Sequence, residues 1–289
     1  MPTPAERQFA RQVAAIDAQW TQNRRAAYKR VLELIEDHTN KVLAAIGRGP
    51  KGDWQAHHLN QVKAGLEAAK LRLKNRLIDE WASNSSATIQ LALTGVDNPL
   101  SGLGIPITLP FSISEREAFL VSEYMPSLIT GLTDEQMAVV TRALQSAVLG
   151  TETGPQIAAA VRKAVGGRIR AAVVMRTEMN RLHNLTRTRR IDELSENHPG
   201  LGKKWKHRPS KSPRPSHVAL HDKVIYPAKG EKFTLAGRYK VYGPHDPSLP
   251  AEHSINCHCT VIAHYDEAQD QPDREDVAGV LGHGIPVRR

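Results

Sequence analysis

The sequence predicts an α+β protein: a mostly helical N-terminal two-thirds, with a long helical hairpin plus shorter helices, and a small C-terminal α+β module of short strands. Two observations predict this fold class. Apolar residues recur at steps of three and four along two long N-terminal segments, which is the period of an amphipathic helix. After residue 198 this period ends, and short alternating stretches separated by Pro and Gly replace it.

Residues 1–93 are expected to form the hairpin. One helix should cover 4–47 and a second about 54–93, joined by a turn that contains three glycines and a proline. Two amphipathic helices with so short a connection should pack antiparallel, as a scaffold or oligomerisation element. Their apolar stripes are Phe9, Val13, Ile16, Trp20, Ala27, Val31, Leu34, His38 and Val42, and then Leu59, Val62, Leu66, Ala69, Leu73, Leu77 and Trp81.

Residues 94–110 are rich in Gly and Pro and are predicted to be a linker. The next segment, 111–197, is predicted to be helical again. Gly131 should end one helix there, and Thr133 with Gln136 fits a capping box that starts the next. The helices expected in this part are 114–130, 133–149, 153–165 and 168–196.

The C-terminal module is expected over 198–265, where short alternating segments indicate strands between turns. Residues 266–289 are acidic and poor in apolar side chains, so we expect a mobile tail. The predicted strands lie around Lys203–His207, Val224–Tyr226, Tyr239–Tyr242 and Thr260–His264.

Positive charge is concentrated in one part of the chain. The net charge is +9 overall, but zero over 1–160, +14 over 161–245 and −5 over 246–289. A region this basic is suited to a polyanion, although a merely solvated basic face would give the same pattern.

Within this basic region, one stretch surrounds a tryptophan with cations. Such a stretch could follow a nucleic-acid backbone without reading its sequence, because no helix-turn-helix, basic zipper or zinc-finger pattern is present. An acidic protein surface is an equally good partner. The residues are Lys203, Lys204, Trp205, Lys206, Arg208, Lys211 and Arg214.

The two cysteines, Cys257 and Cys259, are separated by a single residue. A disulfide between them would be strained. Thiolates and imidazoles suit zinc, so Cys257, Cys259 and His217 are a candidate metal set, with His221 or His253 as the fourth ligand. The alternative is that both cysteines are small buried residues before a last strand. A catalytic Cys–His pair is disfavoured, because no pattern selects its base.

Arg176, Asn180 and Asn184 are spaced four apart, so they should share one helix face, with Glu178 nearby. The favoured interpretation is that side chains on this face form hydrogen bonds with loops of the following module. A catalytic Arg176–Glu178 pair is the functional alternative.

The order of these motifs resembles the phage Mu protein F-like family of phage head morphogenesis, or minor head, proteins. The resemblance covers about residues 135–265. Two departures are His221-Asp222, where the family usually has Asp-Gly, and Cys-His-Cys, where it has Cys-Arg-Cys. The matching pieces are Gly150–Ile157–Val161, Arg176-Thr177-Glu178-x-Asn180 with Asn184, Lys204-Trp205, Arg214-x-x-His217-x-x-Leu220, Pro244 to Pro250, and Ile255-Asn256-Cys257-His258-Cys259.

The resemblance implies a virion protein near the portal and inner head, acting in head morphogenesis and DNA packaging or delivery. The expected partners are the portal or major capsid protein and packaged double-stranded DNA, with several copies per virion and no settled catalytic activity. No apolar run reaches the length of a membrane span, so assembly in the host cytoplasm is expected. Two alternatives remain: an entry-associated enzyme such as a nuclease or transferase, and a zinc-stabilised nucleic-acid-binding module.

Overall fold

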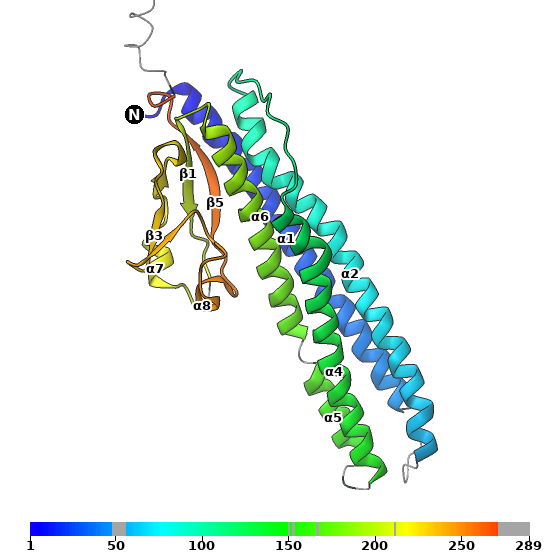
Figure 1. Cartoon of the computed structure of the whole chain (residues 1–289). Coiled ribbons are helices and arrows are strands. Elements are labelled where there is room, and N and C mark those ends of the chain that lie inside the picture. Colours follow the sequence, from blue (N-terminus) through cyan, green and yellow to red (C-terminus); the bar gives the residue numbers. More distant parts are fainter. Residues whose placement is uncertain (48–55, 150, 152–153, 166–167, 211, 271–289) are drawn as a thin grey trace, which may run out of the picture.

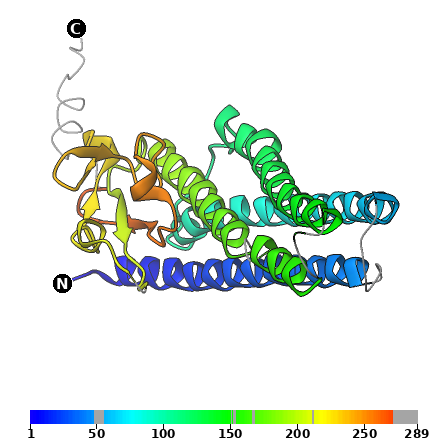
Figure 2. The ribbon, with the colours of Figure 1, turned by 90° about the horizontal axis from the view of Figure 1, so that it is seen from below.

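The computed structural model describes residues 1–47, 56–149, 151, 154–165, 168–210 and 212–270. It is an elongated bundle of helices with a small α+β module packed against one end (Figures 1 and 2). The predicted fold class is therefore confirmed. None of the described helices is both long and apolar enough to cross a membrane.

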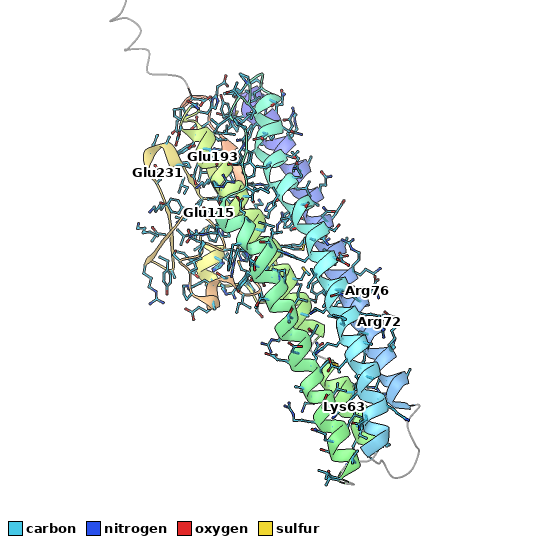
Figure 3. The ribbon with its side chains drawn as sticks, turned by 45° about the vertical axis from the view of Figure 1, so that its right-hand side comes forward. Lys63, Arg72, Arg76, Glu115, Glu193 and Glu231 are labelled. Atoms are coloured by element: carbon cyan, nitrogen blue, oxygen red, sulfur yellow. The ribbon has the colours of Figure 1, made fainter. Side chains whose placement is uncertain are left out.

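The hairpin consists of α1 (Pro4–Gly47) and α2 (Ala56–Ser101), which run side by side in opposite directions (Figure 1). Their predicted stripes form much of the main core, in which the side chains of Trp20 and Trp81 are almost fully buried. The N-terminus lies at the end of the bundle that carries the module (Figure 2). The other end of the hairpin projects away from the module, and Lys63, Arg72 and Arg76 lie toward it (Figure 3).

The prediction of a linker over 94–110 is wrong for its first part, because α2 continues to Ser101. Gly95 is a site of close approach: a Cβ there would clash with the guanidinium of Arg187. Pro99 costs one helical hydrogen bond, but it lies in the last turn, where that loss disturbs little. The connection to the next helix starts only after Ser101.

The next helices also differ from the prediction. The proposed break at Gly131 is wrong, because a single helix passes through it; one helical glycine costs only about 1 kcal/mol relative to alanine. Thr133 bonds the carbonyl of Thr130, and the actual capping box pairs Ser114 with Glu117. The elements are α3 (Glu115–Phe119), a π-helical turn η1 (Leu120–Tyr124), α4 (Met125–Val148), α5 (Gly154–Val165) and α6 (Arg168–Ser195).

The module contains a three-stranded antiparallel sheet and a separate hairpin. The sheet has the order β2-β1-β5, and β3 pairs with β4. All four predicted strand regions contain a strand; the short β3 was not predicted. The elements are β1 (Leu201–Lys206), α7 (Pro215–Val218), β2 (Val224–Ile225), η2 (Pro227–Lys229), β3 (Phe233–Leu235), β4 (Tyr239–Val241), α8 (Ala251–Ser254) and β5 (Thr260–Tyr265).

The module has its own core and a second contact layer with the bundle. Trp205, Phe233 and Val241 are among the residues of its own core. In the second layer, Leu201 and Tyr265 pack against Phe9 of α1 and against apolar residues of α2 and α6. The first residues of the predicted mobile tail are held against the module, because the carboxylate of Asp270 accepts hydrogen bonds from the N–H of Gly200 and the hydroxyl of Tyr265. Residues 271–289 lie outside the described part.

Candidate functional site

The helix α6 holds the segment before β5 through a ladder of hydrogen bonds. Asn180 Nδ2 donates to the carbonyl of Cys257 at 2.8 Å, and Asn184 Nδ2 donates to that of Cys259 at 3.2 Å. The N–H of Val261 returns a bond to Asn184 Oδ1 at 2.8 Å. Four helical residues rise roughly 6 Å and two extended residues about 6.6 Å, so the two repeats match.

Arginines extend this ladder at both ends. Arg176 donates to the side chain of Asn256, as the four-residue spacing predicts. Arg187, which sequence reasoning missed, is fully buried and donates to the carbonyls of Val261, Leu91 and Ala92 at 3.3, 3.2 and 3.4 Å. Burial lowers its pKa to about 10, which still leaves it charged near neutral pH.

Glu178 points to other partners than Arg176. Its carboxylate pairs with Arg181 at 3.2 Å and is almost fully buried. Burial raises its pKa, and Arg181 partly offsets this effect. Arg176 and Glu178 therefore contact different groups: Arg176 bonds Asn256 of the module, whereas Glu178 pairs with Arg181 of the same helix.

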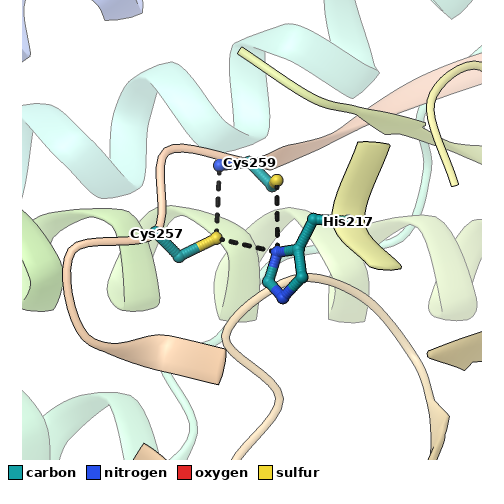
Figure 4. Close-up of side chains that lie close together, drawn as sticks. All are labelled: His217, Cys257 and Cys259. Atoms are coloured by element: carbon teal, nitrogen blue, oxygen red, sulfur yellow. Dashed lines mark hydrogen bonds between the residues drawn. The ribbon is translucent and has the colours of Figure 1, made fainter. Parts of the chain in front are cut away.

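His217, Cys257 and Cys259 come together in the core of the module (Figure 4). The Nδ1 atom of His217 lies 3.4 Å from Cys257 Sγ and 3.5 Å from Cys259 Sγ. The three side chains are each 2% exposed. Ligands around a tetrahedral zinc ion are roughly 3.3–3.8 Å apart, given bonds of about 2.0–2.3 Å, so these separations suit zinc.

Each thiol shifts the pKa of the other. A hydrogen bond with Cys259, together with nearby histidines, lowers the pKa of Cys257 well below its usual value, whereas the same bond and burial raise the pKa of Cys259. The Cys259 backbone N–H also donates to Cys257 Sγ at 3.4 Å. Cys257 is therefore prepared to be a thiolate, the form that binds metals.

Neither predicted fourth ligand faces the sulfur atoms. His253 Nδ1 lies 3.2 Å from His217 Nε2, the nitrogen that faces away from the thiols, so it can orient that ring. His221 instead accepts a bond from the backbone N–H of His207. The structure places His245 beside Cys257, where it helps to lower the pKa of that thiol.

His245 is a residue that sequence reasoning missed. It is 3% exposed, and its backbone has a φ of 61°. Among the described residues, neither of its ring nitrogens has a hydrogen-bond partner. The only sequence signal was its position inside the Pro244–Pro250 motif. A buried imidazole with no partner beside the Cys257 thiol can serve as a fourth ligand, but its nitrogens do not lie within 4.8 Å of all three donors of the cluster, so it would have to move closer.

The predicted basic stretch is not one continuous exposed surface. Lys203 is fully buried, with its ammonium 2.6 Å from Asp192. Trp205 is also fully buried, and its ring lies 5.3 Å from that of Phe233. The prediction that Lys203 and Trp205 contact nucleic acid is therefore wrong. Both belong to β1, whose alternation turns these two side chains inward.

The other described cations of this stretch are partly exposed, in different surroundings. Lys204 and Lys206 are partly exposed on the other face of β1, and Lys206 is 3.4 Å from Asp222. Arg208 pairs with Asp17 of α1 at 2.6 Å, and Arg214 donates to the carbonyl of Ile255 at 2.8 Å. Lys211 lies outside the described residues.

The comparisons agree with the order of these motifs. Residues 138–262, somewhat less than half of the chain, match the model of the family described as phage Mu protein F like protein. No curated protein and no solved structure gives a significant match. The matched range contains α6, the sheet and the Cys/His cluster. Residues 138–262 are therefore similar to the phage Mu protein F-like family, and this similarity suggests a phage head morphogenesis protein.

Proposed function

We propose that the chain is a minor head protein of a tailed bacteriophage, held in the inner head near the portal. It would be assembled in the host cytoplasm, in several copies per virion, and act in head morphogenesis and in DNA packaging or delivery. The observation that carries the proposal is the family match over α6 and the module. Its partners would be the portal or major capsid protein and packaged double-stranded DNA.

The long hairpin suits attachment to an oligomeric partner. It extends beyond the module at the end where Lys63 and Arg72 lie (Figure 3). A stiff arm of this kind can reach a neighbouring subunit while the module stays at a distance, because a helix is about 1.5 Å long per residue. We propose this end of the hairpin as the portal or capsid contact.

A genetic test addresses the head role. Removing the gene from the encoding phage should give defective heads, or heads with abnormal DNA content, in electron micrographs. Supplying the intact chain from a plasmid should restore them. A plasmid copy truncated before residue 138 controls for mere expression of the hairpin. Normal particles and an unchanged plaque yield without the gene would contradict the proposal.

We also propose that zinc binds at His217, Cys257, Cys259 and His245. The support is the buried donor set and the unpartnered imidazole of His245. Such a site would stabilise the module directly, since metal binding to the folded state adds to folding free energy. Zinc binding would also explain why two cysteines separated by a single residue stay reduced.

Elemental analysis of the purified chain tests this. We expect close to one zinc per chain, and a chelator should lower the thermal midpoint. Cys257→Ser and His245→Ala should each lose metal, whereas His221→Ala, a histidine of the same module, should keep it. A wild-type chain that is free of zinc after purification with zinc, and whose midpoint ignores the chelator, would refute the site.

We propose a structural rather than a catalytic role. An entry-associated nuclease or transferase would need Arg176, Glu178, His217 and Cys257 to converge on one pocket. Instead Arg176 contacts Asn256, Glu178 contacts Arg181, and His217 and Cys257 face each other in the core. Incubating the purified chain with duplex DNA and Mg²⁺ should leave the DNA intact; cleavage would favour the enzyme.

A further inference from the structure

A cavity of about 440 Å³ lies outside the Cys/His cluster, between α1, α6 and the segments that flank residues 208 and 258. Arginines from three separate parts of the chain line it. Arg24 and Arg25 come from α1, Arg176 from α6, and Arg208 from the segment after β1, and His258 completes the wall. Arg176 and Arg208 stand out in the sequence, but nothing there indicates that they lie beside α1.

These cations have few acidic partners. Arg208 pairs with Asp17 at 2.6 Å, but Arg24 donates to the neutral amide of Asn180 at 2.9 Å. Arg176 bonds Asn256 and lies over the ring of Tyr28. Among the described residues, a direct ion pair with a carboxylate is thus made by one of the four guanidinium groups, that of Arg208. Charges of one sign held this close repel each other unless an anion lies between them.

The guanidinium groups are close enough to act on the buried Arg24. Burial together with Arg208, Arg176 and Arg25 lowers the pKa of Arg24 to about 10. Among the described residues, His258 Nε2 is buried without a hydrogen-bond partner. An anion in the cavity would relieve the repulsion and supply that partner.

The cavity continues into a second one of about 840 Å³. The two share Arg176, Pro209 and His258, and the second adds Arg214 and the hydroxyl groups of Ser210 and Ser212. The result is a groove with arginines at intervals, which we call the arginine groove. Repeated cations along a groove match a ligand with repeated negative charges, such as a nucleic-acid strand, better than a single small anion.

We propose that the arginine groove binds the phosphodiester backbone of DNA without reading its sequence. Phosphate oxygens would accept bonds from Arg25, Arg176 and Arg208, and guanidinium groups suit such contacts because they can donate two parallel bonds. The proposal rests on the proposed DNA contact and deepens it. It keeps Arg208 and Arg214 of the Lys203–Arg214 stretch, leaves out the buried Lys203 and Trp205, and adds arginines of α1 and α6.

The test is DNA binding by the purified full chain, measured by fluorescence anisotropy with labelled duplex and single-stranded DNA over a range of salt. Arg25→Gln and Arg176→Gln should each weaken binding, and together by about tenfold or more, because each phosphate contact contributes to affinity. The slope of log affinity against log salt should fall by about one for each arginine removed.

Arg72→Gln is the matched control, since Arg72 is exposed on α2, away from the groove (Figure 3). It should leave affinity and salt slope unchanged. Should the double variant fail to fold, judged by circular dichroism, Arg25→Glu alone carries the test, because Arg25 is exposed. Unchanged affinity and slope in the folded arginine variants would overturn the proposal.

Competition separates the possible sources of phosphate. Inorganic phosphate at the same ionic strength should not displace DNA beyond the effect of chloride. Displacement by phosphate alone would reassign the groove to a small anion. These results are independent of the head role. If the chain is found in heads but the arginine variants bind DNA normally, only the arginine-groove proposal is contradicted. If the chain is absent from heads but binds DNA through these arginines, only the head role is contradicted.

Discussion

A single buried histidine links the stability of the bundle to pH. His183 of α6 is fully buried and stacked on Trp20, with ring centroids 4.2 Å apart. Neither ring nitrogen has a hydrogen-bond partner among the described residues. Burial, and then Arg187, Arg208 and Arg24, lower its pKa well below the usual value. The folded protein therefore holds it neutral.

The sign of the pH effect follows from this. Below about pH 6.5 the unfolded chain takes up a proton at His183 and the folded chain does not, so the free energy of unfolding falls as pH falls. The slope from one such group is at most about 1.4 kcal/mol per pH unit. His258, whose pKa is lowered to about 4, adds to the same trend.

Replacing His183→Phe should keep the stacked ring, cost no hydrogen bond, and remove its part of this slope. Urea unfolding of wild type and variant at neutral pH and near pH 5.5 measures it. His221→Phe is the control, because that ring is 40% exposed and its replacement should leave the slope as in wild type. Equal losses of stability on acidification in wild type and His183→Phe would show that the buried ring is not responsible.

At this scale, the sequence showed which residue types occur but not which way they face. The motif Lys203-Lys204-Trp205-Lys206 looked like a cationic surface, yet β1 directs alternate side chains inward and buries Lys203 against Asp192. Burial lowers the pKa of Lys203, and Asp192 partly offsets this. Only a known strand register would have separated the buried lysine from its exposed neighbours.

Among the elements, α6 is the one that positions the candidate metal segment. Asn184 bonds both the carbonyl of Cys259 and the N–H of Val261. Asn184→Ala would leave two buried backbone groups unpaired and should lower the free energy of unfolding by about 2–4 kcal/mol. Glu196→Ala, just past the end of the helix, should change it by less than about 0.5 kcal/mol. A loss for Asn184→Ala no larger than that of this control would contradict the ladder.

The packing of α2 against α6 gives a second test, with two glycines of one helix. Gly95→Ala places a methyl group against the buried guanidinium of Arg187 and should destabilise by about 1–3 kcal/mol. Gly65→Ala meets nothing within 4 Å and should stabilise by up to about 1 kcal/mol. Thermal or urea unfolding compares them; similar effects at both positions would mean that Arg187 does not require the glycine.

Gly95 also illustrates why some helix boundaries were predicted wrongly from the sequence. Periodicity predicted the two long helices, because the stripes of Trp20 and Trp81 recur at helical spacing. Gly95, Pro99 and Gly131 looked like interruptions, but helices tolerate them where packing supplies a compensation. At Gly95 that compensation comes from Arg187, which is distant in the sequence, and local sequence carries no sign of it.

Across the whole molecule, both proposed sites join distant segments. The sequence predicted His217, Cys257 and Cys259 as one set, since thiols and imidazoles are scarce and chemically distinctive. It did not select His245, because many histidines lie in this region. The arginine groove was beyond prediction, because nothing local indicates that Arg24 and Arg25 of α1 lie beside Arg208 and His258.

The measurement that tests the central proposal most directly is the amount of this chain, relative to the portal protein, in purified virions and in DNA-free procapsids, determined by quantitative mass spectrometry. The proposal predicts several copies in both particles, because a head morphogenesis protein joins the shell before DNA enters. Absence of the chain from both particles, with the portal readily detected, would contradict a role in the head.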